Sequence, residues 1–367
     1  MIESNVLEQV EQFSIFGEVS KLGHEQVVFC HDEPTGLKAI IAIHNTVLGP
    51  ALGGTRMWNY ASDQEALVDV LRLSRGMTFK AAISGLNLGG GKAVIIGDAK
   101  KMKSEAFMRR FGRFVESLGG RYITAEDVNT KTRDMEYIAM ETNHVTGLPE
   151  SMGGGGDPSP VTAYGTYVGM KAAVKKVYGS DSLAGKKISV QGVGQVGGYL
   201  VKHLVEEGAT VYITDISEDR LKYISQEYKA HVVGQDEIYD LDVDIYAPCA
   251  LGATLNTNTI NRLKCKVVAG AANNQLADEV KHGNMLIEKG ITLAPDFLIN
   301  AGGLINVYAE FLGGYKAELA YQQAEKIYDT CLTILNNAEV QHITTQEAAM
   351  QMALKRIEDM GKVKLAY

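Results

Sequence analysis

The 367-residue sequence predicts an α/β protein of two domains. Strand-like and helix-like segments alternate on both sides of a glycine- and proline-rich segment, "LPESMGGGGDPSPVT", at 148–162. After about residue 186 the alternation becomes a regular strand–helix repeat with short connections, which is typical of a parallel sheet covered by helices. We therefore expect an N-terminal α/β domain over 1–147, a second domain over 148–335, and a cleft between them.

The first domain is predicted to open with an antiparallel hairpin. Its strands are "QVVFCHD" and "LKAIIAIHNT", and the turn "EPTG" joins them. A helix over 62–79 follows, which begins with a capping box formed by Ser62 and Glu65. The remaining elements are a short strand at 93–98, an amphipathic helix at 104–120 that ends in two glycines, and a strand at 121–128.

The glycine-rich segment is interpreted as a hinge, and a helix over 163–179 follows it. The regular part of the second domain predicts strands at 187–193, 209–215, 243–249, 266–272 and 291–296, with helices near 195–207 and 218–228. From about residue 317 the chain predicts helices only. We expect those over 336–367 to pack back on the first domain.

Composition narrows the class of protein. The net charge is −8 with acids and bases interspersed, which disfavours nucleic acid as a partner. No apolar run approaches the ~20 residues that cross a bilayer, and the N-terminus lacks the apolar core of a secretion signal. The four cysteines are far apart, and the eight histidines form no i, i+4 pair. We expect a cytoplasmic protein with reduced thiols, no metal site and no membrane partner.

The stretch "SVQGVGQVGGYL" predicts a dinucleotide-binding turn of the Rossmann type. It puts Gly192, Gly194 and Gly197 in G-x-G-x-x-G register between a strand and a helix, with Val193, Gln195 and Val196 completing the loop. Asp215 ends the next strand, 23 residues beyond Gly192, where an acid binds the ribose hydroxyls. The alternative is a glycine-rich turn in an ordinary α/β sheet.

This acid also favours NAD as the cofactor. Asp215 would repel a 2′-phosphate, and the nearest arginine that could receive one is Arg220. NAD is therefore favoured over NADP.

Two lysines and one acid are candidates for proton chemistry. Lys92 follows "GLNLGGG", which is not a phosphate loop, because that pattern requires glycine at 86 and a hydroxyl at 93. Lys80 and Asp127 also lie at the ends of predicted elements. A lysine shielded from water, or beside another cation, loses its proton more easily, whereas a charged lysine can hold a carboxylate. The glycines before Lys92 would admit a ligand to the backbone. The alternative is that all three side chains are solvated surface charges or caps.

Several motifs identify a family. The runs "GPALGGTRMW", "GMTFKAAISGLNLGGGKAVI", "GRYITAEDV", "DPSPVTAYG", "APCALGATLN", "AGAANNQL" and "APDFLINAGGLINV" resemble the Glu/Leu/Phe/Val amino-acid dehydrogenases over essentially the whole chain, and most closely the members that act on leucine. The resemblance implies NAD-dependent, reversible oxidative deamination of an L-amino acid to a 2-oxo acid and ammonia. It also implies a homo-oligomer, expected to be an octamer.

The resemblance assigns roles residue by residue. Lys80 binds the substrate carboxylate, Lys92 is the catalytic base, and Asp127 takes part in proton transfer. Further substrate-binding and cofactor-binding positions are implied at Gly53, Gly54, Thr162, Asn273 and Asn274. Thr162 and Asn273 are assigned to the cofactor and Asn274 to the substrate, although the motif leaves open which asparagine contacts which ligand.

The resemblance also implies an apolar side-chain pocket. Its positions fall on Leu52, Met77, Ala125, Leu304 and Val307. Glutamate-specific relatives resemble this pattern but have a lysine where Leu52 stands, so a glutamate side chain would here be buried without a partner. Leucine, valine and isoleucine are the expected substrates. The alternatives are phenylalanine, which apolar pockets exclude by only ~1–3 kcal/mol, and a non-catalytic NAD sensor.

Overall fold

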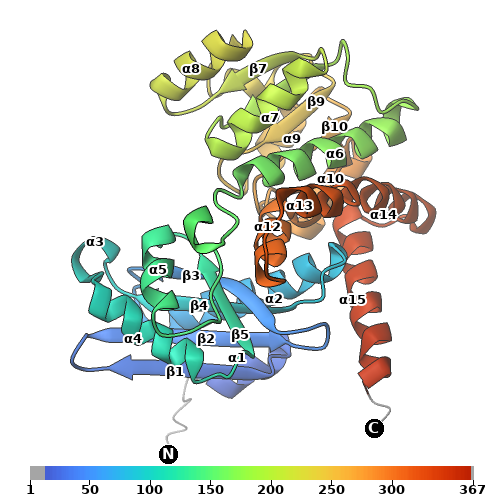
Figure 1. The fold of residues 1–367 in the computed structure, drawn as a ribbon. Helices are drawn as coiled ribbons and strands as arrows, with labels where there is room; N and C mark the ends of the chain where they lie inside the picture. Colours follow the sequence, from blue (N-terminus) through green and yellow to red (C-terminus); the bar gives the residue numbers. More distant parts are fainter. Residues whose placement is uncertain (1–12, 365–367) are drawn as a thin grey trace, which may run out of the picture. The chain divides into compact units, whose positions relative to one another are not determined.

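The structure, a computed structural model, describes residues 13–364 and forms two compact units (Figure 1). One unit contains the chain up to Thr78 together with 89–145, and the other contains 79–88 together with the chain from Thr146 onward. Each unit has one β-sheet with its own helices. The predicted two-domain α/β fold is therefore confirmed, whereas the domain limits at 147/148 and 335/336 stay a prediction.

The first unit has a mixed five-stranded sheet in the order β1-β2-β4-β3-β5. The predicted hairpin is present: β1 and β2 are antiparallel, with Gly36 in the left-handed conformation (φ 71°) in the turn. β4 is antiparallel to β2 and parallel to β3, which is itself parallel to β5. The strands are β1 (Gln26–Asp32), β2 (Leu37–Asn45), β3 (Ala51–Trp58), β4 (Gly89–Ile96) and β5 (Tyr122–Glu126).

The long helix α2 (Asp63–Ile83) covers one face of this sheet. Its Leu67, Val70 and Leu71 pack against Ile40 of β2 and Val94 of β4 in one buried cluster. The predicted capping box forms with a shift of one residue, since Ser62 Oγ accepts from the Glu65 N–H but the Glu65 carboxylate accepts from the Ala61 N–H. The other helices are α1 (Ile15–Leu22), α3 (Ala99–Met102), α4 (Glu105–Glu116) and α5 (Thr132–Ala139).

The second unit has a six-stranded sheet in the order β11-β10-β9-β6-β7-β8, and each pair of neighbours is parallel. The order reverses between β6 and β9, as it does in dinucleotide-binding Rossmann sheets, where the ligand crevice lies at the carboxyl ends of these central strands. The strands are β6 (Lys187–Gln191), β7 (Thr210–Thr214), β8 (His231–Val232), β9 (Ile245–Pro248), β10 (Val267–Val268) and β11 (Thr292–Leu293).

Helices flank this sheet and extend beyond it. The sheet-covering and connecting helices are α6 (Ser159–Tyr178), α7 (Gln195–Glu206), α8 (Glu218–Tyr228), α9 (Thr257–Arg262), α10 (Glu279–Glu288) and α11 (Asp296–Ile299). Two 3₁₀ turns are η1 (Glu150–Met152) and η2 (Glu237–Tyr239). The C-terminal helices are α12 (Gly302–Phe311), α13 (Ala317–Glu325), α14 (Ile327–Gln341) and α15 (Thr345–Lys364).

The last helices lie in the second unit, and α15 also contacts the segment 79–88. The Arg356 guanidinium donates to the backbone oxygens of Ala82 and Leu86 at 3.0 and 2.8 Å and to the side chain of Asn87. This arginine therefore ties the C-terminal helix to the segment that follows Lys80 in the chain.

The glycine-rich segment at 148–155 is anchored by α12. The Glu310 carboxylate accepts the Leu148 N–H at 3.1 Å on one oxygen and the Gly155 N–H at 3.0 Å on the other. Asn306, one turn earlier, donates to the Gly155 carbonyl, and Tyr315 donates to Asn306. A single carboxylate thus holds both ends of the segment.

Among residues 13–364, no helix is both long and apolar enough to cross a bilayer.

Candidate active site

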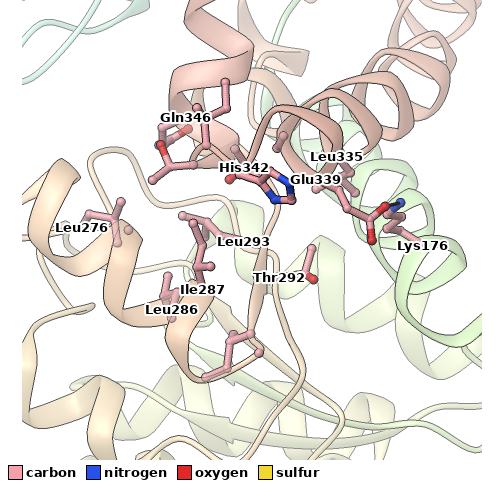
Figure 2. A pocket seen from close by; sticks show the side chains of 17 residues that line it. Lys176, Leu276, Leu286, Ile287, Thr292, Leu293, Leu335, Glu339, His342 and Gln346 are labelled. Atoms are coloured by element: carbon pink, nitrogen blue, oxygen red, sulfur yellow. Dashed lines mark hydrogen bonds and ion pairs between the residues drawn. The ribbon is translucent and has the colours of Figure 1, made fainter.

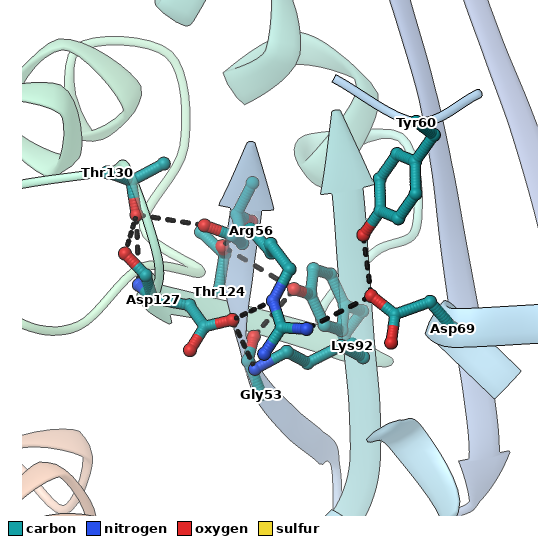
Figure 3. A network of polar contacts seen from close by, with 10 residues as sticks. Gly53, Arg56, Tyr60, Asp69, Lys92, Thr124, Asp127 and Thr130 are labelled. Carbon is teal, nitrogen blue, oxygen red and sulfur yellow. Dashed lines mark hydrogen bonds and ion pairs between the residues drawn. The ribbon is translucent and has the colours of Figure 1, made fainter. Parts of the chain in front are cut away.

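The first unit pairs Lys92 of β4 with Asp127, the residue directly after β5. The Lys92 Nζ lies 2.9 Å from the Asp127 Oδ2, and Lys92 is only 6% exposed (Figure 3). The two residues are 35 positions apart in the sequence, but β3 lies between their two parallel strands, and its Thr55 is paired with both Ala93 and Glu126, the neighbours of Lys92 and Asp127. An ammonium group almost removed from water therefore faces a single carboxylate.

Arg56 of β3, which the sequence analysis did not single out, completes this network. Its Nε donates to the same Asp127 oxygen at 3.0 Å, and its Nη1 donates to Asp69 of α2 at 3.0 Å. Tyr60 donates to Asp69 at 2.6 Å. Arg56 lies in the motif "GGTRMW" as a charged residue within a strand whose other side chains are mostly buried. In the sequence, Arg56 is the one charged residue of the segment ALGGTRMW, and that is the signal that could have identified it.

The network keeps Asp127 ionised. Burial of Asp127 disfavours its charged form, but Lys92 and then Arg56 outweigh burial and hold the pKa of the carboxyl below its ordinary value. Burial likewise opposes the charge on Arg56, whereas Asp127 and Asp69 raise the pKa of the guanidinium. Asp127 is thus an anion at neutral pH, shared by two cations.

The glycines around Lys92 serve a different purpose from the one expected. They belong to β4 rather than to a loop, so Lys92 lies inside a strand and not at its end. A Cβ atom at Gly90 would lie 2.1 Å from the Thr78 Oγ1 of α2, and one at Gly91 would lie 2.7 Å from the Tyr122 ring. The space beside these glycines is filled by the protein itself. Their lack of a side chain lets α2 and β5 pack directly on the strand that carries Lys92.

The same reasoning explains Gly53 and Gly54 of β3. A Cβ at Gly53 would lie 1.7 Å from the Gly91 carbonyl oxygen, and one at Gly54 would lie 2.2 Å from the Glu126 carbonyl oxygen. Both positions are therefore required for close packing of β3, whatever their role in binding. Of the predicted pocket residues in this unit, Leu52 and Ala125 are buried in β3 and β5, and Met77 is half-buried on α2.

The second unit brings Lys80 together with two asparagines. The Lys80 Nζ donates to the Asn300 Oδ1 at 2.6 Å. The Asn300 amide in turn donates to the Asn273 Oδ1 at 2.7 Å and to the Ala271 carbonyl at 3.1 Å. Asn300 is 4% exposed and had not been predicted, although it lies in the motif "LINAGG". It links the predicted carboxylate-binding lysine to Asn273.

The remaining predicted positions of this unit lie on α6, on α12 and in the segment after β10. Asn274 follows Asn273 in the left-handed conformation (φ 51°), and its carbonyl accepts the Ala253 N–H. Leu304 is buried and Val307 half-buried, one turn apart on α12. Thr162 of α6 donates its hydroxyl to the Pro158 carbonyl.

The predicted dinucleotide loop connects β6 to α7, as expected. Gly192 has φ 96°, and a Cβ there would lie 2.7 Å from Ala250, in the turn after β9. Gly197 packs on the Gly192 carbonyl, where a Cβ would lie 2.0 Å away. A Cβ at Gly194, the N-cap of α7, would meet open space. A tight turn, the open space beside Gly194 and a helix N-terminus together fit a pyrophosphate.

Asp215 lies against this loop. Its carboxylate accepts the Val193 N–H at 2.7 Å and the Ser217 N–H at 2.9 Å. Arg220 donates to the carbonyl oxygens of Val193 and Gly194. The side chain at the ribose-binding position is therefore an acid, and the neighbouring arginine is engaged with the loop backbone.

A hollow of about 370 Å³ lies elsewhere in the second unit, among β11, α10, α14 and α15 (Figure 2). Leu276, Leu286 and Leu293 form an apolar part of its wall, and His342 and the Lys176–Glu339 ion pair also line it. None of the predicted site residues lines it. In the described part of the chain, no three His, Cys, Asp or Glu side chains are grouped to hold a metal ion.

Comparison with known proteins identifies the family. Residues 24–144 match the family model "Glu/Leu/Phe/Val dehydrogenase, dimerisation domain". Residues 153–217 and 212–364 match "Glutamate/Leucine/Phenylalanine/Valine dehydrogenase". The two-domain α/β fold and these matches define the class of protein as an amino-acid dehydrogenase. The chain belongs to the Glu/Leu/Phe/Val dehydrogenase family and is an oxidoreductase of that class.

Individual relatives differ in their substrates. The chain is 56% identical to leucine dehydrogenase of Thermoactinomyces intermedius, over 96% of each chain. It is 48% identical to phenylalanine dehydrogenase of Bacillus thermotolerans, over 96% of this chain and 93% of the relative. The crystal structure of L-tryptophan dehydrogenase from Nostoc punctiforme matches with a TM-score of 0.85 at 47% identity, covering 95% of this chain and 99% of that chain.

Proposed function

We propose that the protein catalyses the NAD-dependent, reversible oxidative deamination of L-leucine, and of valine and isoleucine, to the branched-chain 2-oxo acid and ammonia. The observation that carries this proposal is the buried Lys92 ammonium, 2.9 Å from the ionised Asp127. A buried lysine paired with a half-buried carboxylate needs a purpose, because replacing such a pair with apolar side chains is often neutral or stabilising. Proton transfer to and from an amino acid is such a purpose.

Each residue has one role in this chemistry. Lys80 holds the substrate carboxylate and so orients the Cα hydrogen. Lys92, once neutral, is the base that removes a proton from water, and Asp127 moves protons to the departing amine. NAD, when bound, accepts the hydride from Cα. General acid–base catalysis of this kind contributes on the order of 10²–10⁴-fold for each group.

The reaction balances on these groups. Loss of hydride from Cα and of a proton from nitrogen leaves an imine on the substrate. Water, deprotonated by Lys92, adds to the imine carbon. The resulting carbinolamine expels ammonia as its nitrogen is protonated and its hydroxyl loses a proton through Asp127. One amino acid, one water and one NAD⁺ thus become one 2-oxo acid, one ammonia, one NADH and one proton.

NAD rather than NADP is proposed as the cofactor. The loop at Gly192–Gly197 would hold the pyrophosphate, and Asp215 would accept hydrogen bonds from the ribose hydroxyls. A 2′-phosphate beside the Asp215 carboxylate would be repelled. The guanidinium of Arg220, which could neutralise it, donates to two loop carbonyl groups instead.

Branched aliphatic amino acids are favoured by the side chains proposed to line the pocket. Leu52, Met77, Ala125, Leu304 and Val307 are all apolar, and a buried carboxylate or ammonium in the substrate side chain would lack a partner. The higher identity to a leucine dehydrogenase than to the phenylalanine and tryptophan relatives supports leucine. Phenylalanine is the second candidate, because an added apolar group changes affinity by only ~1–3 kcal/mol.

The protein is proposed to act as a homo-oligomer, expected to be an octamer. The match of residues 24–144 to a dimerisation domain supports association. β1 is the edge strand of its sheet, and Phe29 on it is 55% exposed, which is the kind of surface that another copy can cover.

The decisive experiment compares kcat/KM for leucine, valine, isoleucine, phenylalanine and tryptophan with NAD and with NADP. We expect leucine with NAD to have the highest value. Tryptophan should be the poorest substrate, because its ring requires the largest expansion of the pocket. NADH formation is followed by its absorbance, and glutamate is the charged control.

Two outcomes would contradict the proposal. A higher kcat/KM for phenylalanine or tryptophan than for leucine would overturn the substrate assignment and leave the reaction intact. NADH binding without turnover of any amino acid would instead indicate a sensor.

A further inference from the structure

We infer that Arg56 is a positioning residue for proton transfer: it shares the carboxylate of Asp127 with Lys92 and so allows Lys92 to give up its proton. This inference rests on the proposed function, since it concerns how the base of that reaction becomes neutral. It is carried by the arrangement of three side chains on adjacent strands of one unit (Figure 3).

The central observation is that both cations contact one oxygen. The Lys92 Nζ and the Arg56 Nε lie 2.9 and 3.0 Å from the Asp127 Oδ2. If Lys92 were the only partner, its deprotonation would leave a half-buried, uncompensated carboxylate, which is costly. With Arg56 in place, the carboxylate keeps a permanently charged partner whether Lys92 is an ammonium or an amine.

Arg56 also acts on Lys92 directly. Because the two groups contact the same oxygen, two positive charges lie close together in a poorly solvated site, and each disfavours the charged form of the other. Arginine does not lose its proton in proteins, so the repulsion is relieved at Lys92. This is the neighbouring cation that a lysine needs if it is to act as a base near neutral pH.

Arg56 is held in this position from its other side. Its Nη1 donates to Asp69 at 3.0 Å, and Tyr60 donates to the same Asp69 oxygen at 2.6 Å. The guanidinium is therefore held between α2 and the residue that follows β5. Asp69, which accepts hydrogen bonds from both Arg56 and Tyr60, thus fixes the position of the guanidinium.

The charged and titratable groups around the pair come from every neighbouring element. Asp127 follows β5, Arg56 is on β3, Tyr60 follows β3, and Asp69 is on α2. Tyr122 of β5 donates to the Gly53 carbonyl, and burial, its largest influence, raises the pKa of its phenol. Tyr60 also remains protonated at neutral pH, because burial and then Asp69 raise its pKa. Near neutral pH the two tyrosines therefore keep their protons and add no charge beside Lys92.

The test uses two substitutions of the same residue. Arg56→Gln removes the charge but keeps a hydrogen-bond donor for Asp127, whereas Arg56→Lys keeps the charge. The pH dependence of kcat/KM for leucine is measured for both and for the parent protein. Arg109→Gln is the matched control, because Arg109 forms ion pairs with Glu105 and Glu141 in the same unit.

In Arg56→Gln we expect the low-pH limb of the kcat/KM profile to move to higher pH by about one unit. A neighbouring charge shifts the pKa of a buried group by about 1–3 units. At a pH on this limb the variant therefore loses about tenfold in kcat/KM, which is regained at higher pH. Arg56→Lys and Arg109→Gln should keep the parental profile.

A second measurement does not depend on turnover. Amine-selective acylation modifies only neutral lysine, so its rate at Lys92, followed by peptide mass spectrometry across pH, reports the proton on that residue. In Arg56→Gln the onset should move to higher pH. The exposed Lys38 in the same digest is the internal reference.

The outcomes separate the two hypotheses. If the low-pH limb of the Arg56→Gln profile lies at the same pH as that of the parent, or if the acylation of Lys92 begins at the same pH, the role of Arg56 is overturned. The dehydrogenase proposal would still stand. A parent protein without amino-acid-dependent NADH formation would refute the proposed function, while a shifted acylation onset would still support the electrostatic link between Arg56 and Lys92.

Discussion

Lys92 and Asp127 show what individual side chains contribute. In the network of Figure 3, Asp127 has two cationic partners, so removal of Lys92 leaves the carboxylate paired with Arg56. The fold should therefore tolerate loss of the base. Lys80 lies in a different unit and bonds to Asn300, so its removal should affect a different step.

We expect Lys92→Ala to lower kcat by at least ~10²-fold with little change in NADH affinity, because general acid–base catalysis is worth on the order of 10²–10⁴. Lys80→Ala should mainly raise the KM for leucine, with a smaller loss of kcat from poorer alignment. Steady-state kinetics and NADH fluorescence titration measure both effects, with Lys38→Ala as the control at an exposed lysine. Near-parental kinetics in both site variants would show that the assigned roles are wrong.

The sequence predicts some of these residues better than others. Lys92 and Asp127 could be found because each belongs to a distinctive motif, and the structure brings them into contact. Arg56 and Asn300 lie in equally recognisable motifs, but their importance comes from partners that are distant in the chain, Asp69 and Lys80. Only the folded sheet reveals which side chains share an oxygen.

At the level of elements, β4 shows how a glycine run can be misread. The sequence predicted that the strand would begin only at residue 93, yet Gly89–Gly91 already belong to it, because helix α2 and the neighbouring strands occupy the space where side chains would be. The hairpin and the strand–helix repeats were predicted well, because their patterns depend on local periodicity. Close packing between elements that are distant in the chain produces no periodic pattern in the sequence, so it could not be predicted in this way.

Two glycine substitutions test this packing. Gly90→Ala would put a Cβ 2.1 Å from the Thr78 Oγ1 and 2.2 Å from its backbone nitrogen, so we expect a loss of at least ~1–3 kcal/mol in the free energy of unfolding. Gly76→Ala, on an exposed part of α2 with no atom within 4 Å of the new Cβ, should instead gain up to ~1 kcal/mol. Denaturant titration compares the two. Equal stabilities would refute the packing argument.

At the level of the whole molecule, the two units divide the proposed chemistry. The first holds Lys92, Asp127 and Arg56, and the second holds the dinucleotide loop, Lys80 and Asn300. Two domains were predicted because the pattern of strands and helices changes after the glycine- and proline-rich segment. The sequence could not predict that residues 79–88 would cluster with the second unit, because this depends on long-range contacts such as those of Arg356.

Assembly is the prediction that belongs to this scale. Eight chains of 39.8 kDa give an octamer of about 320 kDa, which light scattering coupled to size-exclusion chromatography would detect. Phe29→Lys on the edge strand β1 should yield smaller species, because a charge on that strand opposes pairing. Tyr223→Lys, at an exposed position of α8, is the control. A parent protein that elutes as a monomer would contradict the expectation.

The anchorage of the glycine-rich segment by Glu310 has a consequence for how selectivity could evolve. This carboxylate fastens both ends of the segment to α12, the same helix that carries Leu304 and Val307. A substitution within 148–155 that displaces either end should therefore also displace α12, the helix proposed to shape the substrate pocket. Substitutions at residues that do not contact the amino acid can thus change substrate preference. Comparing only the pocket-lining residues of related enzymes would overlook the cause.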